Sequence, residues 1–256
     1  MHKSLVIAQN TFREAVRDRV LYNLVLFVLL ITASAIFLGE LTVGQESRTI
    51  VNLGLGAMLV FGAFISIFVG VSLVSKEIEK RTIYAIFSKP IGRGEFIIGK
   101  YLGLCLTLLV NVLVMGIGVS LAILYVGGGN LALTIWGAIF LIYLELLILT
   151  AVAILFSSFS TPALSALLTF FVFVIGHFSR SLRDFAANLG SAVTRLFFDV
   201  LYYALPNLSF YEFRTNAAHG ESAPLALLGG AILYAAAYTF VLLVITTLIF
   251  RRRNFK

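Results

Sequence analysis

Long apolar stretches separated by polar segments dominate the chain. A helix needs roughly 20 such residues to cross a bilayer core about 30 Å thick. Six stretches approach that length: Leu21 to Leu38, Leu53 to Val74, Leu102 to Val126, Leu131 to Phe156, Ala163 to Phe178, and Leu225 to Phe250. They are continuous rather than alternating, which excludes barrel strands, because backbone in lipid must satisfy its own hydrogen bonds. The pattern predicts an all-α, polytopic membrane protein with six transmembrane helices in a single domain over residues 1–256.

Composition agrees with this pattern. Apolar residues make up 60% of the chain and charged residues only 12%, whereas soluble domains carry about a quarter charged residues. Too little polar surface remains to cover a water-soluble globule, so lipid must cover much of the surface. The single cysteine excludes a disulfide framework and a cysteine-based zinc site.

The distribution of basic residues predicts the orientation. With the amino terminus inside, the predicted cytoplasmic segments hold 14 of the 19 Lys and Arg residues. The outer segments keep Arg48, Arg180, Arg183, Arg195 and Arg214. Basic residues favour the cytoplasmic side, so we expect both termini to be cytoplasmic. The net charge of +7 follows from this topology, and we expect no nucleic-acid partner.

Three longer polar segments carry the remaining information. The first, residues 3–20, places Leu5, Ala8 and Phe12 at helical spacing before the first span. This spacing predicts an amphipathic helix on the inner membrane surface. A basic flank that only sets topology is the alternative.

The second is the cytoplasmic loop between the second and third spans. Its residues 76–89 begin with charges of both signs and then place Ile83, Ile86 and Phe87 at i, i+3, i+4 spacing. An apolar patch framed by charge often marks a docking surface. We therefore predict a short cytoplasmic helix, although a solvated loop helix without a partner is also possible.

The third is the outer segment 179–224, where Leu182, Phe185, Leu189 and Val193 begin a further helical pattern. This pattern predicts short helices that dip into or lie on the outer face, between spans five and six.

Sequence motifs for catalysis and nucleotide binding fail on inspection. Residues 94–100 match a phosphate-binding loop up to Lys100, but Tyr101 stands where magnesium coordination needs Ser or Thr. No strand precedes the motif. We find no pattern of catalytic residues and no metal-ligand cluster, so we expect no enzyme activity, metal or cofactor in this chain.

Glu145 lies near the middle of the fourth span. A charged carboxylate there is costly unless it is paired, hydrated or protonated. One interpretation is a carboxylate that lines a translocation path or couples to protons. The other is a protonated or hydrogen-bonded side chain that joins helices, with a Tyr, Ser or Thr of a neighbouring helix as its partner.

Several segments together resemble the permease subunits of type-2 ABC exporters, closest to the branch linked to multi-copper-enzyme maturation. The resemblance covers nearly the whole chain, and the segments that carry it are residues 8–19, 77–91, 99–101, 205–208 and 250–255. The copper function transfers poorly, because the chain lacks the clustered Met, His and Cys that soft metals require. A lipid-like, amphiphilic or small peptide cargo fits an apolar cavity better.

The resemblance implies an ATP-driven exporter with the ATPase on another chain. Residues 76–89 would be the coupling helix, 3–20 the connecting helix, and 179–224 the re-entrant outer helices. The coupling residues would be Glu77, Glu79, Arg81, Ile83, Ile86 and Phe87. Partners would be two ATPase copies, which hold ATP and magnesium, a second permease copy or related permease, and lipid of a prokaryotic inner membrane.

The main alternative is a stand-alone channel or secondary transporter that uses Glu145. Such proteins usually show intramembrane charge pairs or broken helices in repeated halves. The sequence shows one acid and no convincing repeat of the first three spans. A membrane-embedded enzyme ranks third, since catalytic residues are missing.

Overall fold

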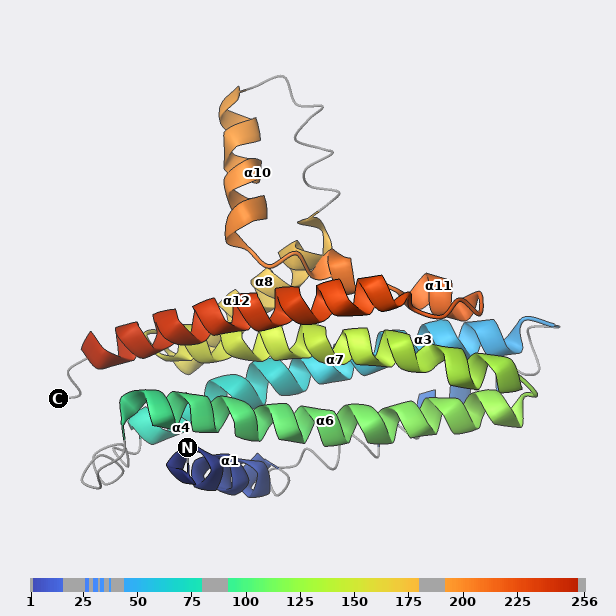
Figure 1. Ribbon diagram of the computed structural model, residues 1–256, viewed down its shortest axis with the longest axis horizontal. Coiled ribbons are helices and arrows are strands. Elements are labelled where there is room, and N and C mark those ends of the chain that lie inside the picture. Colours follow the sequence, from blue (N-terminus) through green and yellow to red (C-terminus); the bar gives the residue numbers. More distant parts are fainter. Residues whose placement is uncertain are drawn as a thin grey trace.

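The chain folds into a bundle of long helices (Figure 1). The computed structural model describes residues 2–15, 44–79, 92–179 and 192–252, and several positions between 26 and 37. No strand occurs among the described residues. The predicted all-α fold is therefore confirmed for this part of the chain.

Helices account for nearly all the described ranges. The first half contains α1 (His2–Ala15), α3 (Glu46–Phe64), the π-helix η2 (Ile65–Val69), α4 (Gly70–Glu79), α6 (Arg93–Tyr125) and α7 (Gly129–Ser157). The second half contains α8 (Pro162–His177), α10 (Ala192–Ala204), the 3₁₀ helix η3 (Leu208–Tyr211), α11 (Arg214–Ala218) and α12 (Leu225–Arg252).

Four of the six predicted spans are confirmed as helices long and apolar enough to cross a membrane. These are Glu46–Glu77, Arg93–Tyr125, Gly129–Ser157 and Leu225–Arg252. The fifth, predicted from Ala163 to Phe178, is the 16-residue helix α8, about 24 Å long at 1.5 Å per residue. It is shorter than a bilayer core of about 30 Å.

The first predicted span, residues 21–38, falls mostly outside the described residues. The positions described between 26 and 37 are all helical. Phe27 and Ile31 are buried, and the Phe27 ring meets the Phe61 ring edge-on with centroids 5.9 Å apart. This part of the first span therefore packs on α3.

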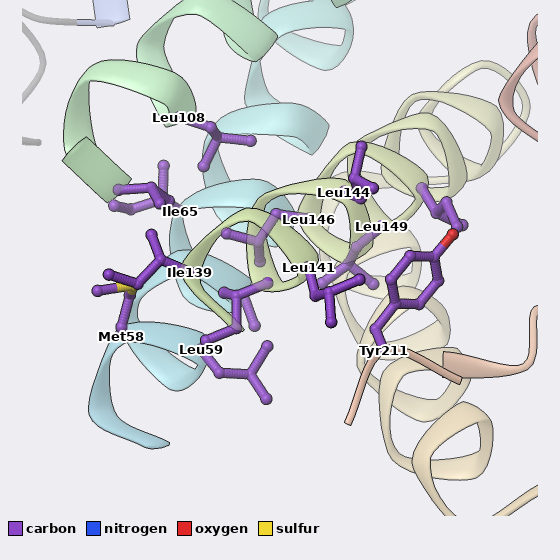
Figure 2. Close-up of a cluster of buried hydrophobic side chains, with 14 of the residues drawn as sticks. Met58, Leu59, Ile65, Leu108, Ile139, Leu141, Leu144, Leu146, Leu149 and Tyr211 are labelled. Carbon is purple, nitrogen blue, oxygen red and sulfur yellow. The ribbon is translucent and has the colours of Figure 1, made fainter. Parts of the chain in front are cut away.

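Helix α7 lies at the centre of the bundle, in contact with α3, α4, α6, α8 and α12. In its most apolar window 72% of the residues are buried, against 22% in α12. Figure 2 shows its leucines and isoleucines meeting side chains such as Met58, Ile65 and Leu108. The continuous apolar sequence of α7 fits this position, because the helix has neighbours on most sides.

Small residues let α3 and α4 approach α7 closely. A Cβ on Gly62 would overlap the Leu146 side chain, and one on Gly70 would lie 3.0 Å from the Ala153 Cβ. Close approach of helices in lipid commonly uses such residues. The four-residue spacing of Gly62, Ser66 and Gly70 thus serves packing within the chain, at least at the two glycines.

Outer residues between α8 and α12 form separate short elements. Helix α10 projects away from the bundle (Figure 1), and its helical pattern follows the prediction. The rest of the predicted helical pattern, up to residue 191, lies outside the described residues. In contrast, η3 packs against α7 and α8, and α11 packs against α3 and α7.

Candidate functional site

The predicted coupling residues divide at the end of α4. Glu77 and Glu79 belong to its last turn. Arg81, Ile83, Ile86 and Phe87 lie outside the described residues. Their role in coupling therefore stays a prediction.

Glu77 contacts the bundle through a buried lysine. Lys100 Nζ in α6 lies 3.2 Å from Glu77 Oε1 and 3.5 Å from Glu14 Oε2 in α1. The Lys100 side chain is only 6% exposed, whereas Glu77 is 21% and Glu14 is 45% exposed. Because a buried ammonium is costly unless paired, these two carboxylates hold α1 and α4 to α6. The sequence interpretation gave Lys100 no such role.

Helix α1 packs closely against two glycines of α6. A Cβ on Gly99 would lie 2.7 Å from Ile7, and a Cβ on Gly103 would lie 2.6 Å from the Ala8 carbonyl oxygen. Thr11 also packs on Gly103 and is 1% exposed. Residue numbers increase together along both helices, so α1 and α6 run in the same direction. Figure 1 shows α1 beside α6.

The carboxyl end of α12 meets the first turn of α6. Arg93 Nη1 donates hydrogen bonds to the carbonyl oxygens of Phe250 at 2.9 Å and Arg251 at 2.7 Å. A helix leaves its last carbonyls without partners inside the helix, and a guanidinium satisfies them well. We call residues Arg93–Gly103 the α6 base; it joins α1, α4 and α12.

The apparent phosphate-binding motif lies within the α6 base. Residues 94–100 are helical throughout, so their backbone N–H groups beyond the first turn bond within the helix. Glu95 Oε2 accepts a hydrogen bond from the Gly92 N–H at 3.0 Å and caps the helix start. The segment therefore lacks the open loop that cradles phosphates.

Glu145 of α7 is buried, with 2% of its side chain exposed. Its Oε1 lies 3.2 Å from Nε2 of His177, the last residue of α8. This contact is at ion-pair distance, but Oε1 has no hydrogen-bond partner among the described residues. The nearest described polar side chain to Oε1 is thus His177, and not the Tyr, Ser or Thr that the second interpretation of Glu145 named.

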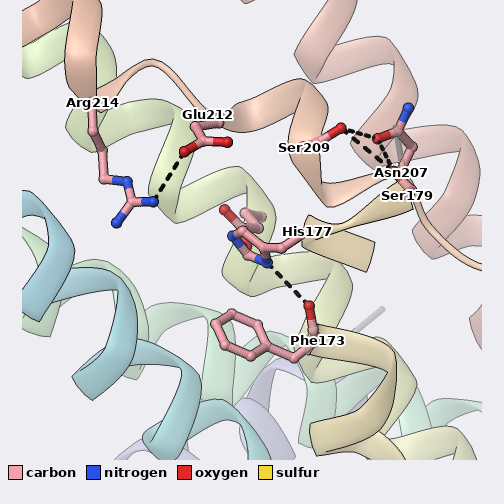
Figure 3. Close-up of polar contacts among 8 residues, drawn as sticks. Phe173, His177, Ser179, Asn207, Ser209, Glu212 and Arg214 are labelled. Carbon is pink, nitrogen blue, oxygen red and sulfur yellow. Dashed lines mark hydrogen bonds and ion pairs between the residues drawn. The ribbon is translucent and has the colours of Figure 1, made fainter. Parts of the chain in front are cut away.

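A second contact fixes the orientation of the histidine ring. His177 Nδ1 lies 3.0 Å from the Phe173 carbonyl oxygen, one turn earlier in α8 (Figure 3). The Phe173 ring also packs against the imidazole, with centroids 4.7 Å apart. His177 therefore points Nε2 toward α7.

The contact between Glu145 and His177 could have been predicted from the hairpin that α7 and α8 form. Residues 158–161 join α7 to α8, so the helices must run antiparallel. Glu145 lies 12 residues, about 18 Å, before the end of α7. His177 lies 15 residues, about 23 Å, after the start of α8. The two positions are thus about one turn apart in height.

The segment from η3 to α11 lies over this pair. Glu212 Oε1 and Arg214 Nη2 are 3.2 Å apart (Figure 3), and their charges act on both Glu145 and His177. A Cβ on Gly56 in α3 would lie 3.4 Å from Arg214 Nη1. An outer-segment charge pair thus sits close to the intramembrane pair.

Tyr211 anchors this segment in the bundle. Its side chain is 2% exposed, and its hydroxyl donates a hydrogen bond to the Ala231 carbonyl of α12 at 3.0 Å. Burial, and then the nearby Tyr234 and Glu145, raise the pKa of the Tyr211 hydroxyl. The phenol therefore stays protonated and keeps its donor.

Asn207 continues the anchoring on the other side. Its Oδ1 accepts hydrogen bonds from Ser179 at 2.7 Å and Ser209 at 2.6 Å, and its backbone N–H donates to the Tyr234 hydroxyl at 2.9 Å. Figure 3 shows the three side chains together. The segment is thus tied to the end of α8 and to α12.

Two polar sites therefore stand out, the α6 base and the Glu145–His177 pair. The described residues contain no group of three or more His, Cys, Asp or Glu side chains that could hold a metal ion. A carboxylate and an imidazole at 3.2 Å can instead exchange or share a proton.

The comparison with known families agrees with this arrangement of apolar spans. The profile described as ABC-2 family transporter protein matches residues 5–255. The profile describes the family as a whole, so it does not support the resemblance to the multi-copper-enzyme-maturation branch. A search of curated proteins gave no match. Because the profile covers almost all 256 residues, the chain belongs to the ABC-2 family of transporter proteins, the membrane transport subunits of ABC systems.

Proposed function

We propose that this protein is the permease subunit of an ATP-driven exporter and that residues 76–89 couple it to a separate ATPase. Family membership carries the transport function and implies an ABC ATPase as partner. Coupling through this loop and export as the direction of transport go beyond what family membership implies, and we propose both. ATP and magnesium would be held by two ATPase copies, beside a second permease copy or a related permease.

The contacts of the α6 base support the coupling role. Glu77, at the end of α4, is held to Lys100, which also holds Glu14 of α1. Residues 80–91 connect α4 to α6, so both ends of this loop are fixed at the same place in the bundle. A push on the loop would therefore act on α1, α4 and α6 together.

The position of the outer segment supports a translocation path that is closed on the side of the bundle opposite the α6 base. Ala223 would lie 2.8 Å from a Cβ on Gly137 of α7, eight residues into that helix. Leu208 packs on Gly176 near the end of α8. These contacts favour a re-entrant cap over the translocation path. Most of the bundle's inward side chains are apolar, which fits a lipid-like, amphiphilic or small peptide cargo.

Phe87→Ala tests the coupling loop. Truncation of a buried anchor at an interface centre costs about 2 kcal/mol or more, so we expect at least a tenfold loss of ATPase affinity or of cargo-stimulated ATP hydrolysis. The measurement is co-purification with the ATPase and ATP turnover in reconstituted membranes.

Phe159→Ala is the matched control for this experiment. Phe159 follows the end of α7 on the same predicted cytoplasmic side and is 49% exposed. We expect this variant to behave as the parent. If Phe87→Ala also behaves as the parent in both assays, residues 76–89 are not the coupling element.

Cysteine labelling tests the predicted topology. In a Cys105→Ala background, we expect cysteines at Gln45 and His219 to react with an impermeant thiol reagent on intact cells. Cysteines at Ser88 and Asn254 should react only after the membrane is opened. This result follows from the bias of basic residues toward the predicted inside. Reaction at position 88 from outside would overturn the orientation.

A further inference from the structure

The hydrogen-bond chemistry of His177 fixes where its protons can be. A carbonyl oxygen only accepts hydrogen bonds, so the 3.0 Å contact with Phe173 requires a proton on Nδ1. A neutral imidazole carries only one N–H. In the neutral ring, Nε2 therefore presents a lone pair toward Glu145.

The facing atom on Glu145 is also an acceptor when the carboxyl group is ionised. Two acceptors 3.2 Å apart in a buried position repel each other. One added proton between them removes this repulsion. It can reside on the carboxyl group and be donated to Nε2, or reside on Nε2 and be donated to the carboxylate.

We propose that Glu145 and His177 form a buried proton-binding site that holds one proton between Glu145 Oε1 and His177 Nε2. With this proton the pair is neutral in either arrangement; without it, the pair carries one negative charge. Uptake takes one proton from water, and release returns it. No other reactant is needed.

Burial, and not the surrounding charge, favours a neutral loaded site, because both side chains are largely shielded from water. Among the described residues, the charged groups acting on the pair are Glu212 and Arg214, which pair with each other at 3.2 Å. The Tyr211 hydroxyl also interacts electrostatically with Glu145. It donates a hydrogen bond to the Ala231 carbonyl oxygen. Arg214 acts more strongly than Glu212 on both members, so the net effect of these nearby charges opposes the bound proton and burial favours it.

Release of the proton bears on the segment 208–218. The unloaded pair has a negative charge that water would solvate, and this segment lies between the pair and the outer surface under the predicted topology. Loss of the proton should therefore favour a state in which the segment moves outward and admits water. The site would make the outer part of the bundle sensitive to acidity.

Glu145→Gln provides the main test, using the purified full chain in lipid nanodiscs. The Gln amide donates a hydrogen bond to Nε2, as the shared proton does, but does not dissociate. We expect the parent to lose thermal stability as pH rises through release of the proton, with a matching increase in hydrogen exchange at 208–218. Glu145→Gln should show neither pH-dependent change, after correction for intrinsic exchange rates.

Glu212→Gln is the matched control, since it removes a neighbouring carboxylate that is 48% exposed. It should keep both pH-dependent changes but shift their midpoint to lower pH, because Arg214, without Glu212 as its partner, then favours the ionised Glu145. A Glu145→Gln profile identical to that of the parent would overturn the proposal.

Nitrogen-15 NMR of the parent ring gives a second, independent measurement. In a chain carrying His2→Gln and His219→Gln, only His177 contributes an imidazole signal. We expect Nδ1 to stay protonated at every pH, while Nε2 responds in one step that coincides with the infrared change of the Glu145 carboxyl group. A neutral ring with its proton on Nε2 would contradict the proposal even if Glu145→Gln fails to fold.

Discussion

Lys100→Met should lower the free energy of unfolding by about 2 to 3 kcal/mol. Breaking a buried ion pair by removing one partner costs about 3–5 kcal/mol, and the partial exposure of Glu14 and Glu77 places this case at or slightly below the lower end of that range. Methionine keeps most of the apolar volume, so the loss reports the missing ammonium. The measurement is unfolding of the purified chain in mild detergent.

Arg13→Met is the control for Lys100→Met. Arg13 lies on the exposed side of α1, next to Glu14, and removal of an exposed charge usually changes stability by less than about 0.5 kcal/mol. If both variants lose the same stability, general charge and not the buried contact explains the effect. Glu77→Gln combined with Lys100→Met should cost less than the sum of the two single changes, because both remove one interaction.

Gly103→Ala should destabilise the chain by about 1 to 3 kcal/mol, the usual cost of overpacking. The added methyl group would lie 2.6 Å from the Ala8 carbonyl oxygen and 2.5 Å from Thr11 Cβ. The first of these atoms is backbone, so α1 must move away from α6. Hydrogen exchange of α1 and unfolding of the chain measure this effect.

Gly229→Ala, in α12, makes the same chemical change where a Cβ would meet nothing within 4 Å. Alanine is the better helix former by about 1 kcal/mol, so this variant should be neutral or more stable. Of the two substitutions, only Gly103→Ala is thus expected to destabilise the chain. A stabilising Gly103→Ala would show that α1 does not pack on α6 as described.

The long helices could be predicted from sequence because apolar length alone specifies them. The predicted span from Leu225 to Phe250 and the observed α12 differ by only two residues at their ends. The third predicted span begins at Leu102, but α6 begins at Arg93. Hydropathy locates the stretch that lipid covers, and a helix can continue beyond it into water.

The polar contacts were harder to predict because each joins segments far apart in the chain. Lys100 follows Glu77 by 23 positions and Glu14 by 86, so no local pattern connects them. Gly99 and Gly103 have the spacing of a helix-packing motif, but the sequence does not say which helix they receive. Glu145 and His177 were more accessible, since the short connection between α7 and α8 limits their relative height.

The length of α6 has a mechanical consequence. Its 33 residues span about 50 Å, against a bilayer core of about 30 Å. A continuous helix resists bending, so it behaves as a lever whose short arm is the α6 base. Three other helices grip that arm, through Lys100, Gly103 and Arg93. A tilt applied there would swing the far arm of α6 through a proportionally larger arc, without any rearrangement inside the helix.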